Sequence, residues 1–490
     1  MDRRDFIRAL VAGSAAAAAH HAVPFAAASS HLPGSDTPPA WAIGFEGLGD
    51  DLSLTAMKVE GTVPEECYGT LYRNGPALYE RAGERYQHWF DPDGMIQAFR
   101  LGPAGVTHEG RFVRTRKFLE ESEAGRFLYN GAGSQVADPQ PASNNDTANP
   151  ANINIQPLAG ELLALWEAGS AHSIDPTTLE TRERKIWSDE LDGVPFSAHP
   201  KYDDRGDLWN IGSVPWLGAP KLVLYHINAG GVLQKAKLHA LDFAGYIHDF
   251  VLTPRYLVVL NSSAVFGTGE TFVDRMHWDP NRASQLLVFD RNDLSLARVI
   301  EVPAAFVFHF GNGWEDASGL HFTACQYENA DITVSSMRKM AQQSGGPLHA
   351  PPELMRYDVD LRSGRCSISA LAVPMEFPNF DLRRPFTPQT LLGTGERDAS
   401  ESGLASALLS VNPQSGEFSR YDYGDGVIVQ EPLYLKGGAE GYAMHAFLDY
   451  EKHRSGIALF RIDRLNEGPI MTATMERVLP LGFHGCFMPA

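Results

Sequence analysis

Four of the 17 histidines of this chain stand at one recurring position of a repeated sequence pattern. Each follows a turn centred on Asp or Asn by 19 to 24 residues, and the four are His199, His248, His309 and His484. If the repeats are arranged around a common axis, equivalent positions converge on it and four imidazole groups meet there. Such a set of borderline nitrogen donors suits iron, copper or zinc. The pattern therefore predicts a metal site built by four separate repeats.

Three glutamates accompany this pattern. Glu376 and Glu431 follow their turns by 16 and 19 residues, so a carboxylate takes the recurring position in two repeats that lack the histidine. Glu167 ends the strand that precedes the turn at Asp175. A metal-bound histidine usually donates its second ring N–H to a carboxylate, which fixes its tautomer and orientation. We therefore predict that these three glutamates orient the metal-binding histidines.

The repeated unit consists of an alternating apolar strand, a turn and a second alternating strand. This period of two predicts a hairpin that is half-buried on one face. The seven turns lie at 101–102, Asp175, Asn228, Asp290, Asp360, Asn412 and Asp463. Seven such units, spaced by about 60 residues, favour an all-β fold, a seven-bladed β-propeller, over a large β-sandwich. In a propeller the recurring position begins each inner strand, next to the axis.

The composition agrees with such a fold. The chain has 490 residues, of which 43% are apolar and 21% charged, and its 46 Gly and 32 Pro favour many short strands joined by turns. A net charge of −19 argues against nucleic acid as a partner, because basic patches carry the electrostatic part of that affinity. The cysteines form no CxxC pair and are expected to be unpaired and buried; they are Cys67, Cys325, Cys366 and Cys486.

The N-terminus has the features of a targeting segment. Residues 1–28 combine a twin arginine, a modest apolar run and the small-residue cleavage signal Ala26–Ala28, as in a twin-arginine export signal. Residues 29–44 are expected to form a linker, and residues 45–490 a single propeller domain. No later stretch reaches the roughly 18 uninterrupted apolar residues of a membrane span. The sequence therefore predicts a periplasmic mature protein, soluble or peripheral to the membrane.

The histidine-bearing segments resemble the four histidine motifs of the carotenoid cleavage oxygenase family. They read FSAHPKYD, YIHDFVLTPRYLVV, FHFGNGWED and GFHG. Residues 69–101 are similar to the N-terminal signature of that family. The segments LLALWEAGSAHSIDPTTLET, EFP and QEP are similar to its motifs around the histidine-orienting glutamates. In motif order, the resemblance covers nearly all of residues 45–490.

The resemblance implies a propeller capped by helices and loops that form a substrate tunnel over the central four-histidine site. It implies one Fe(II) per chain, held by the four histidines, as the cofactor of a non-haem iron dioxygenase. The implied reaction is O2-dependent cleavage of a conjugated C=C bond in a carotenoid or apocarotenoid, which gives aldehyde or ketone products. The partners would then be an apolar polyene and O2.

Two departures from the family pattern bear on the substrate. Many relatives have a threonine near the open iron position, where this chain has Ile153. Relatives that cleave phenolic stilbenes use a lysine just before the first glutamate and a tyrosine upstream; Trp166 replaces that lysine, and Tyr129 matches the tyrosine. The missing lysine favours an apocarotenoid substrate. The candidate tunnel residues, each with core packing as its alternative, are Tyr129, Ile153, Trp166, Phe310, Trp314, Phe483 and Phe487.

Other functions on the same fold are open at this point. They are stilbene (lignostilbene-type) cleavage, isomerohydrolase-type chemistry, and a non-enzymatic propeller that binds polyenes. Residues 264–267 and 127–129 are candidates for an apolar lip that touches a membrane, although neither is a strongly amphipathic basic helix. The cleaved bond and the number of associated chains are also open.

Overall fold

The computed structural model of the protein describes residues 37–215, 219–345, 348–395 and 403–490. The predicted export signal, residues 1–28, and the first part of the predicted linker lie outside the described residues. The linker ends earlier than predicted, because Ala40–Phe45 forms a short 3-10 helix, η1. Its Trp41 and Phe45 side chains are buried in the largest apolar cluster, so the folded domain begins before residue 45.

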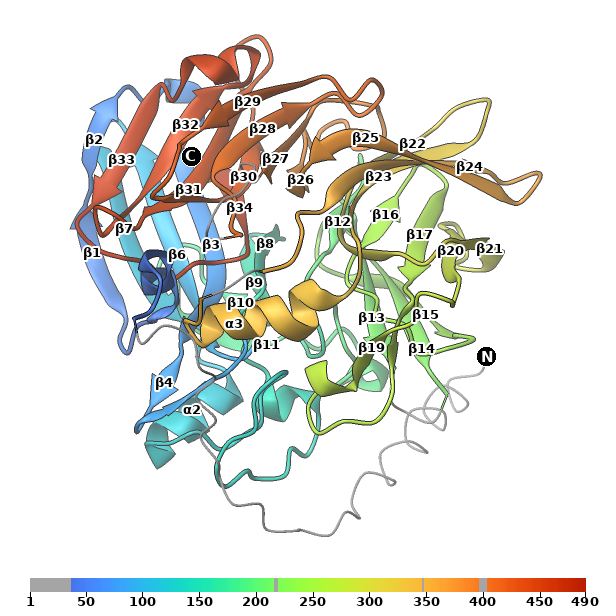
Figure 1. The fold of residues 1–490 in the computed structure, drawn as a ribbon, viewed down its shortest axis with the longest axis horizontal. Helices are drawn as coiled ribbons and strands as arrows, with labels where there is room; N and C mark the ends of the chain where they lie inside the picture. The colour runs from blue at the N-terminus through green and yellow to red at the C-terminus, as the bar shows by residue number, and fades with distance from the viewer. Residues whose placement is uncertain (1–36, 216–218, 346–347, 396–402) are drawn as a thin grey trace.

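Seven antiparallel sheets form the blades of a propeller (Figure 1). From the axis outward, blade one consists of β34 (His484–Pro489), β3 (Gly69–Leu78), β6 (Asp93–Gly102), β7 (Gly105–Phe112) and β1 (Leu52–Ala56). Blade two consists of β8 (Asn154–Leu158), β9 (Glu161–Leu165), β10 (His172–Ile174) and β11 (Thr181–Arg184). Blade three consists of β12 (Lys201–Tyr202), β13 (Leu208–Val214), β14 (Lys221–Ile227) and β15 (Leu233–Ala240). Blade four consists of β16 (Phe250–Leu252), β17 (Tyr256–Asn261), β20 (Ser284–Asp290) and β21 (Leu296–Val302).

The remaining blades follow the same order. Blade five consists of β22 (Phe306–Glu315), β23 (Leu320–Tyr327), β24 (Glu353–Asp360) and β25 (Arg365–Pro374). Blade six consists of β26 (Glu376–Asn379), β27 (Leu391–Gly395), β28 (Ala407–Val411) and β29 (Phe418–Asp422). Blade seven consists of β30 (Val427–Leu435), β31 (Tyr442–Asp449), β32 (Arg454–Arg461), β33 (Met471–Met475) and β2 (Lys58–Gly61). Two small hairpins complete the strands, β4 (Glu80–Arg81) with β5 (Glu84–Arg85) and β18 (Ala264–Phe266) with β19 (Met276–Trp278).

Both ends of the folded chain close the ring. The C-terminal strand β34 pairs with β3 and becomes the inner strand of blade one, with His484 opposite Asn74. Near the N-terminal end of the domain, β1 lies at the outer edge of blade one, and the next strand, β2, pairs with β33 at the outer edge of blade seven. Ring closure pairs strands that would otherwise be exposed edges. It also brings the last of the four histidines to the axis.

The predicted turns are confirmed, because each connects the third and fourth strands of a blade. Their Asp and Asn side chains stabilise the turns locally. Asp175 Oδ1 accepts the backbone N–H groups of Thr177 and Thr178, and Asn412 Oδ1 accepts those of Gln414 and Ser415. These are Asx turns, in which the side chain replaces a backbone acceptor.

Apolar side chains between neighbouring blades form the core. Val258 of β17 and Phe322 of β23, for example, belong to one buried cluster between blades four and five. Inner strands are covered on both faces, so β17 is buried at five of its six positions, whereas the outer strand β25 is exposed or half-buried at nine of its ten positions. The four cysteines are unpaired, as predicted; three of them are buried, whereas Cys366 is half-buried, contrary to the prediction.

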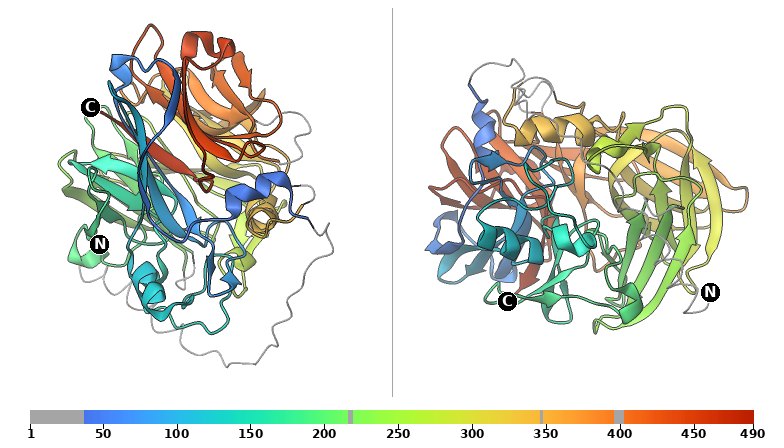
Figure 2. Two further views of the ribbon diagram at one scale, coloured as in Figure 1. Left: turned by 90° about the vertical axis from the view of Figure 1, so that its left-hand side faces the viewer. Right: turned by 90° about the horizontal axis from the view of Figure 1, so that it is seen from below.

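Helices and long connections cover the end of the axis from which the inner strands start (Figure 2). The helices at this end include α2 (Arg116–Ala124), the π-helix η6 (Ile332–Ser336) and α3 (Met337–Ala341). Three 3-10 helices lie at this end as well, η3 (Asn145–Ala148), η4 (Asp189–Leu191) and η5 (Val273–Arg275). Two others, η2 (Glu65–Cys67) and η7 (Ile462–Glu467), lie at the opposite end, because η2 precedes the second strand of blade one and η7 connects the third and fourth strands of blade seven. Within the described ranges, no helix has the length and apolar character needed to cross a membrane.

Candidate metal centre

The four predicted histidines meet at the propeller axis, each from a different blade. His484 begins β34 and His309 lies in β22, while His199 and His248 stand two residues before β12 and β16. Each offers a ring nitrogen, and these four atoms all lie within 4.8 Å of one another. All four side chains are buried. The repeat register therefore predicted a real cluster.

The chemistry of this cluster fits a bound metal ion. The Nε2 atoms of His199 and His309 are buried and have no hydrogen-bond partner among the described residues. Burial lowers the pKa of His199 well below its usual value and lowers the pKa of His484 to about 4, so both rings are neutral at pH 7. Neutral imidazole is the form that coordinates a metal, and an orphaned buried nitrogen is costly without one. Four such donors fit Fe(II).

Carboxylates orient three of the four rings, as predicted. His309 Nδ1 lies 2.5 Å from Glu376 Oε2, and His484 Nδ1 lies 2.9 Å from Glu431 Oε1. His248 Nδ1 contacts Glu167 Oε1. A carboxylate at Nδ1 leaves Nε2 as the metal-facing atom. Burial opposes a charged His309 ring, but attraction to Glu376 outweighs it and raises the pKa of His309.

Glu431 is held by a partner that the sequence pattern did not reveal. Arg73 of β3 forms a buried ion pair with Glu431 Oε2 at 2.6 Å and also donates to the Phe483 carbonyl oxygen at 2.7 Å. The Gly485 N–H donates to the same carboxylate oxygen at 2.9 Å. Burial raises the pKa of Glu431, but attraction to His484 and Arg73 outweighs it, so the net pKa is lowered and the group stays charged. Arg73 falls in the N-terminal segment 69–101, outside the repeat register.

Two further residues at the centre were missed. The Tyr246 hydroxyl donates to Glu167 Oε1 at 2.8 Å and lies 2.9 Å from His248 Nδ1. The Phe377 ring stacks on His309 with ring centroids 5.2 Å apart, and its backbone φ of 55° is unusual for an aromatic residue. The only available sequence signal was their proximity to His248 and Glu376 in the chain.

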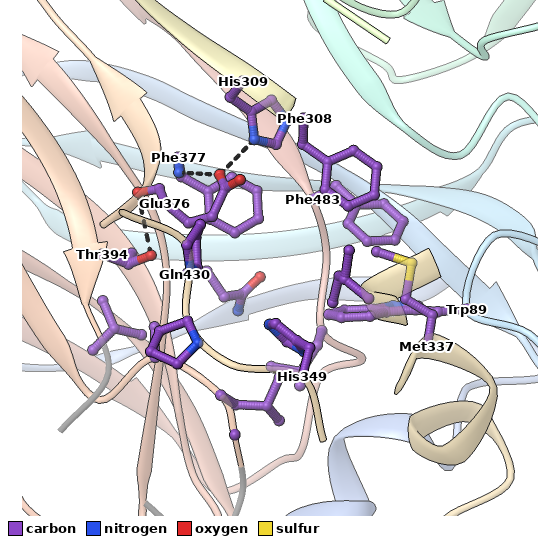
Figure 3. A pocket seen from close by; sticks show the side chains of 18 of the residues that line it. Trp89, Phe308, His309, Met337, His349, Glu376, Phe377, Thr394, Gln430 and Phe483 are labelled. Carbon is purple, nitrogen blue, oxygen red and sulfur yellow. Dashed lines mark hydrogen bonds and ion pairs between the residues drawn. The ribbon is translucent and has the colours of Figure 1, made fainter. Parts of the chain in front are cut away.

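Two largely apolar cavities meet beside the histidines. The first, which we call the apolar cavity, has a volume of about 930 Å³ and reaches His248, His309 and His484. Figure 3 shows Phe308, Phe483, Trp89 and Met337 around it. The second, the side cavity, has about 1250 Å³ and reaches Glu167 and Tyr246. Phe90 and Ile153 line both cavities, so the two spaces adjoin at these side chains.

A third cavity lies on the other side of the histidines and is more polar. This axial cavity, of about 850 Å³, is lined by His199, His309 and His484 together with groups such as Lys201 and Asn312. Inner-strand residues that line the axial cavity, such as Phe310, come after a metal-site histidine in the chain. Phe308 and Phe483, which line the apolar cavity, come directly before His309 and His484. Because the inner strands start at the capped end, residues that follow a histidine in the chain lie farther from the cap.

The direction of the inner strands explains why some of the predicted tunnel residues line the apolar cavities and others do not. Ile153 and Phe483 line the apolar cavity and Trp166 lines the side cavity, in agreement with the prediction. Phe310, Trp314 and Phe487 follow their histidines and lie elsewhere: Phe310 packs between blades and borders the axial cavity, Trp314 stacks on His321, and Phe487 packs between blades one and seven.

Tyr129 also lies outside both apolar cavities. It is buried beside α2, where its hydroxyl contacts Glu120. The neighbouring residues Phe127 and Leu128 are buried as well, so segment 127–129 cannot form the proposed membrane-contacting lip. In segment 264–267, Ala264 is buried and Phe266 lines the side cavity.

Fold and site together define a propeller metalloprotein with four histidine ligands and an apolar substrate chamber. The sequence matches the retinal pigment epithelial membrane protein family over residues 48–489, and the chain belongs to this family. It is 28% identical to the apocarotenoid-15,15'-oxygenase of Synechocystis sp., over 92% of this chain and 96% of that protein. It is 25% identical to the isoeugenol monooxygenase of Pseudomonas nitroreducens, over 90% and 95%. The crystal structure of cobalt-substituted Synechocystis apocarotenoid oxygenase superposes with a TM-score of 0.83 at 26% identity, covering 93% of this chain and 99% of that one.

Proposed function

We propose that this protein is a non-haem iron oxygenase that cleaves a conjugated C=C bond of a carotenoid or apocarotenoid with O2. The net reaction converts one C=C bond and one O2 into two C=O groups. The observation that carries the proposal is the position of the four-histidine site, with three orienting carboxylates, at the junction of two apolar cavities. The similarity over 92% of the chain to an apocarotenoid oxygenase supports the same reaction.

Different residues of this chain would bind the metal, orient its ligands and bind the substrate. Fe(II), held by the four histidines, supplies the activation of O2 when it is bound. Glu167, Glu376 and Glu431 hold three of the rings in the tautomer that presents Nε2 to the metal. The apolar cavities remove a polyene from water, which is favourable by about 25 cal/mol per Å² of buried apolar surface. Ile153 lies at the junction of the two cavities, where it can contact the polyene near the metal.

A phenolic stilbene is the weaker candidate substrate, because the groups that would bind a phenol are engaged elsewhere. The Tyr129 hydroxyl contacts Glu120. Lys117 does reach the side cavity, but its ammonium group is buried between Asp93 at 2.9 Å and Glu121 at 3.0 Å. A polyene therefore fits the two cavities better than a phenolate does.

The direct test combines metal analysis with product analysis. Purified protein is assayed for iron, and then incubated with apocarotenals, a carotene and a hydroxystilbene, with and without O2. We expect about one iron per chain and aldehyde products from apocarotenals only when O2 is present. Stoichiometric zinc without iron, or cleavage without O2, would contradict the mechanism. A change of polyene geometry without O2 consumption would indicate isomerohydrolase-type chemistry instead.

We also propose that the protein is exported to the periplasm by the twin-arginine route. The support is the sequence of residues 1–28, with Arg3 and Arg4 before an apolar run and a small-residue cleavage signal. Cell fractionation of the wild type and of an Arg3→Lys/Arg4→Lys variant tests this proposal. We expect the wild type in the periplasm and the variant in the cytoplasm, and equal retention of both in the cytoplasm would refute it.

A further inference from the structure

Two polar side chains in the apolar cavity have no part in holding the metal. Gln430 projects from β30, the inner strand of blade seven, and His349 lies in the connection between α3 and β24. Both line a space otherwise bounded by residues such as Trp89, Ile428 and Leu481. In Figure 3 the Gln430 amide and the His349 imidazole point into the same part of this cavity.

The Gln430 amide is fixed in place with its donor end unused. Its Oε1 accepts the Gly482 N–H at 2.9 Å, which determines the orientation of the amide. Among the described residues, Nε2 donates no hydrogen bond to the protein, although it can donate two. An amide donor facing an apolar space costs free energy unless an acceptor meets it. The cavity therefore offers an oriented site for an acceptor oxygen.

His349 adds a second hydrogen-bonding group to the same cavity. Burial lowers the pKa of His349 to about 4, so its ring is neutral near pH 7. The ring packs against Tyr327, with ring centroids 5.4 Å apart. A neutral imidazole carries one N–H donor and one acceptor nitrogen. It can therefore contact a carbonyl oxygen or a hydroxyl group, and neither charge nor metal is required.

We propose that Gln430 and His349 bind the terminal oxygen of the polyene and thereby select which double bond lies at the four-histidine site. This inference rests on the proposed polyene-cleaving function. A polyene repeats the same apolar unit along its length, so apolar walls alone distinguish poorly between positions shifted by one unit. A hydrogen bond at one end removes that ambiguity. The predicted substrate class is a linear polyene with a carbonyl or hydroxyl group at one end.

The test compares two substrates and three variants. The substrates are an apocarotenal and the hydrocarbon polyene with the same number of conjugated double bonds. Gln430→Met and His349→Phe each remove a polar group at similar side-chain size. Met340→Leu, in α3, changes an apolar wall of the same cavity and serves as the matched control. Iron content is measured for every variant, because Gln430 also contacts the backbone near His484 through Gly482.

For the wild type, we expect kcat/KM to favour the aldehyde, with a single pair of cleavage products. In Gln430→Met and in His349→Phe, kcat/KM for the aldehyde should fall about tenfold, the size expected for one neutral hydrogen bond. The hydrocarbon should change less than twofold, and products from neighbouring double bonds should appear. Met340→Leu should affect both substrates equally and keep a single cleavage position.

Binding to metal-free protein separates failure of this inference from failure of the proposed function. Trp89 lines the cavity, so quenching of the tryptophan fluorescence of the protein reports polyene binding without turnover. If neither polyene is cleaved but the aldehyde still binds more tightly through Gln430 and His349, the proposed reaction fails and the oxygen-binding site stands. Equal loss for both substrates in His349→Phe, with unchanged products, would overturn the inference while the cleavage function stands.

Discussion

The two ends of the propeller axis differ in character although the same inner strands build both. On the capped side of the histidines, the apolar cavity is bounded by Phe308, Phe483 and residues of the cap. On the opposite side, the axial cavity is bounded by Lys201, Asn312 and other polar groups. The boundary between them is the layer of four histidines. A few residues along each inner strand therefore separate an apolar cavity from a polar one.

Two of the histidine-orienting carboxylates, Glu376 and Glu431, lie on inner strands and border different cavities. Glu376 borders the apolar cavity, and its contacts are His309 Nδ1 and the Phe377 N–H. Glu431 borders the axial cavity and carries, in addition to His484, a buried ion pair with Arg73. Equivalent positions of the repeat thus have different electrostatic surroundings. We infer that the capped side determines substrate binding and that the opposite side mainly determines stability.

Removal of a metal ligand should have the largest effect. In His309→Ala we expect loss of stoichiometric iron and a loss of cleavage activity of at least a thousandfold, because one of the four metal ligands is removed. Polyene binding to the apolar cavity, measured by quenching of tryptophan fluorescence, should persist, since most of the cavity walls are unchanged. Full cleavage activity of the variant would instead identify a metal-independent reaction.

The two carboxylates should respond unequally to the same change. Glu431→Gln removes the charge that partners Arg73, so we expect iron affinity to fall about 10- to 100-fold and the free energy of unfolding to fall by about 3–5 kcal/mol. Glu376→Gln has no buried arginine partner and should show the loss of iron affinity with a smaller loss of stability. Iron titration and denaturant unfolding measure the two quantities. Equal destabilisation by both variants would argue against a special role of the Arg73 pair.

A polar group in the apolar cavity should weaken substrate binding. Ile428→Thr replaces a buried aliphatic group of that cavity by a hydroxyl, and burial of an unpaired hydroxyl costs about 1–3 kcal/mol. We expect KM for an apocarotenal to rise about tenfold with little change in iron content. Steady-state kinetics at saturating O2 provide the measurement. An unchanged KM would place the substrate outside this cavity.

The sequence was sufficient to predict the features that follow the repeat. The distance from each turn to the next inner strand located all four histidines and two of the three glutamates, because every blade uses the same connection. It could not locate the walls of the apolar cavity. Trp89, Met337 and Leu404 come from segments between blade strands that have no common register.

Local proximity to a ligand was a poor guide for the aromatic residues. Phe310 and Phe483 both adjoin a histidine in the chain, yet only Phe483 lines the apolar cavity. The difference is the direction of the inner strand, which starts at the cap and carries Phe310 toward the opposite end. Arg73 was missed for another reason: its contact with Glu431 joins residues 358 positions apart through ring closure.

The smallest effect is expected from a substitution at the axial cavity. It tests most directly whether the two ends of the propeller axis have separate roles. Lys201 pairs with Asp249 at 2.9 Å, but the Asp249 carboxylate also accepts the Phe250 and Phe310 N–H groups at 2.7 and 3.0 Å. In Lys201→Met those two donors remain, so the free energy of unfolding should fall by only about 1–2 kcal/mol. KM for the polyene should stay within twofold of the wild type, in contrast to Ile428→Thr. A tenfold rise of KM in Lys201→Met would show that substrate binding extends through the histidine layer, and the two ends of the axis would then act as one chamber.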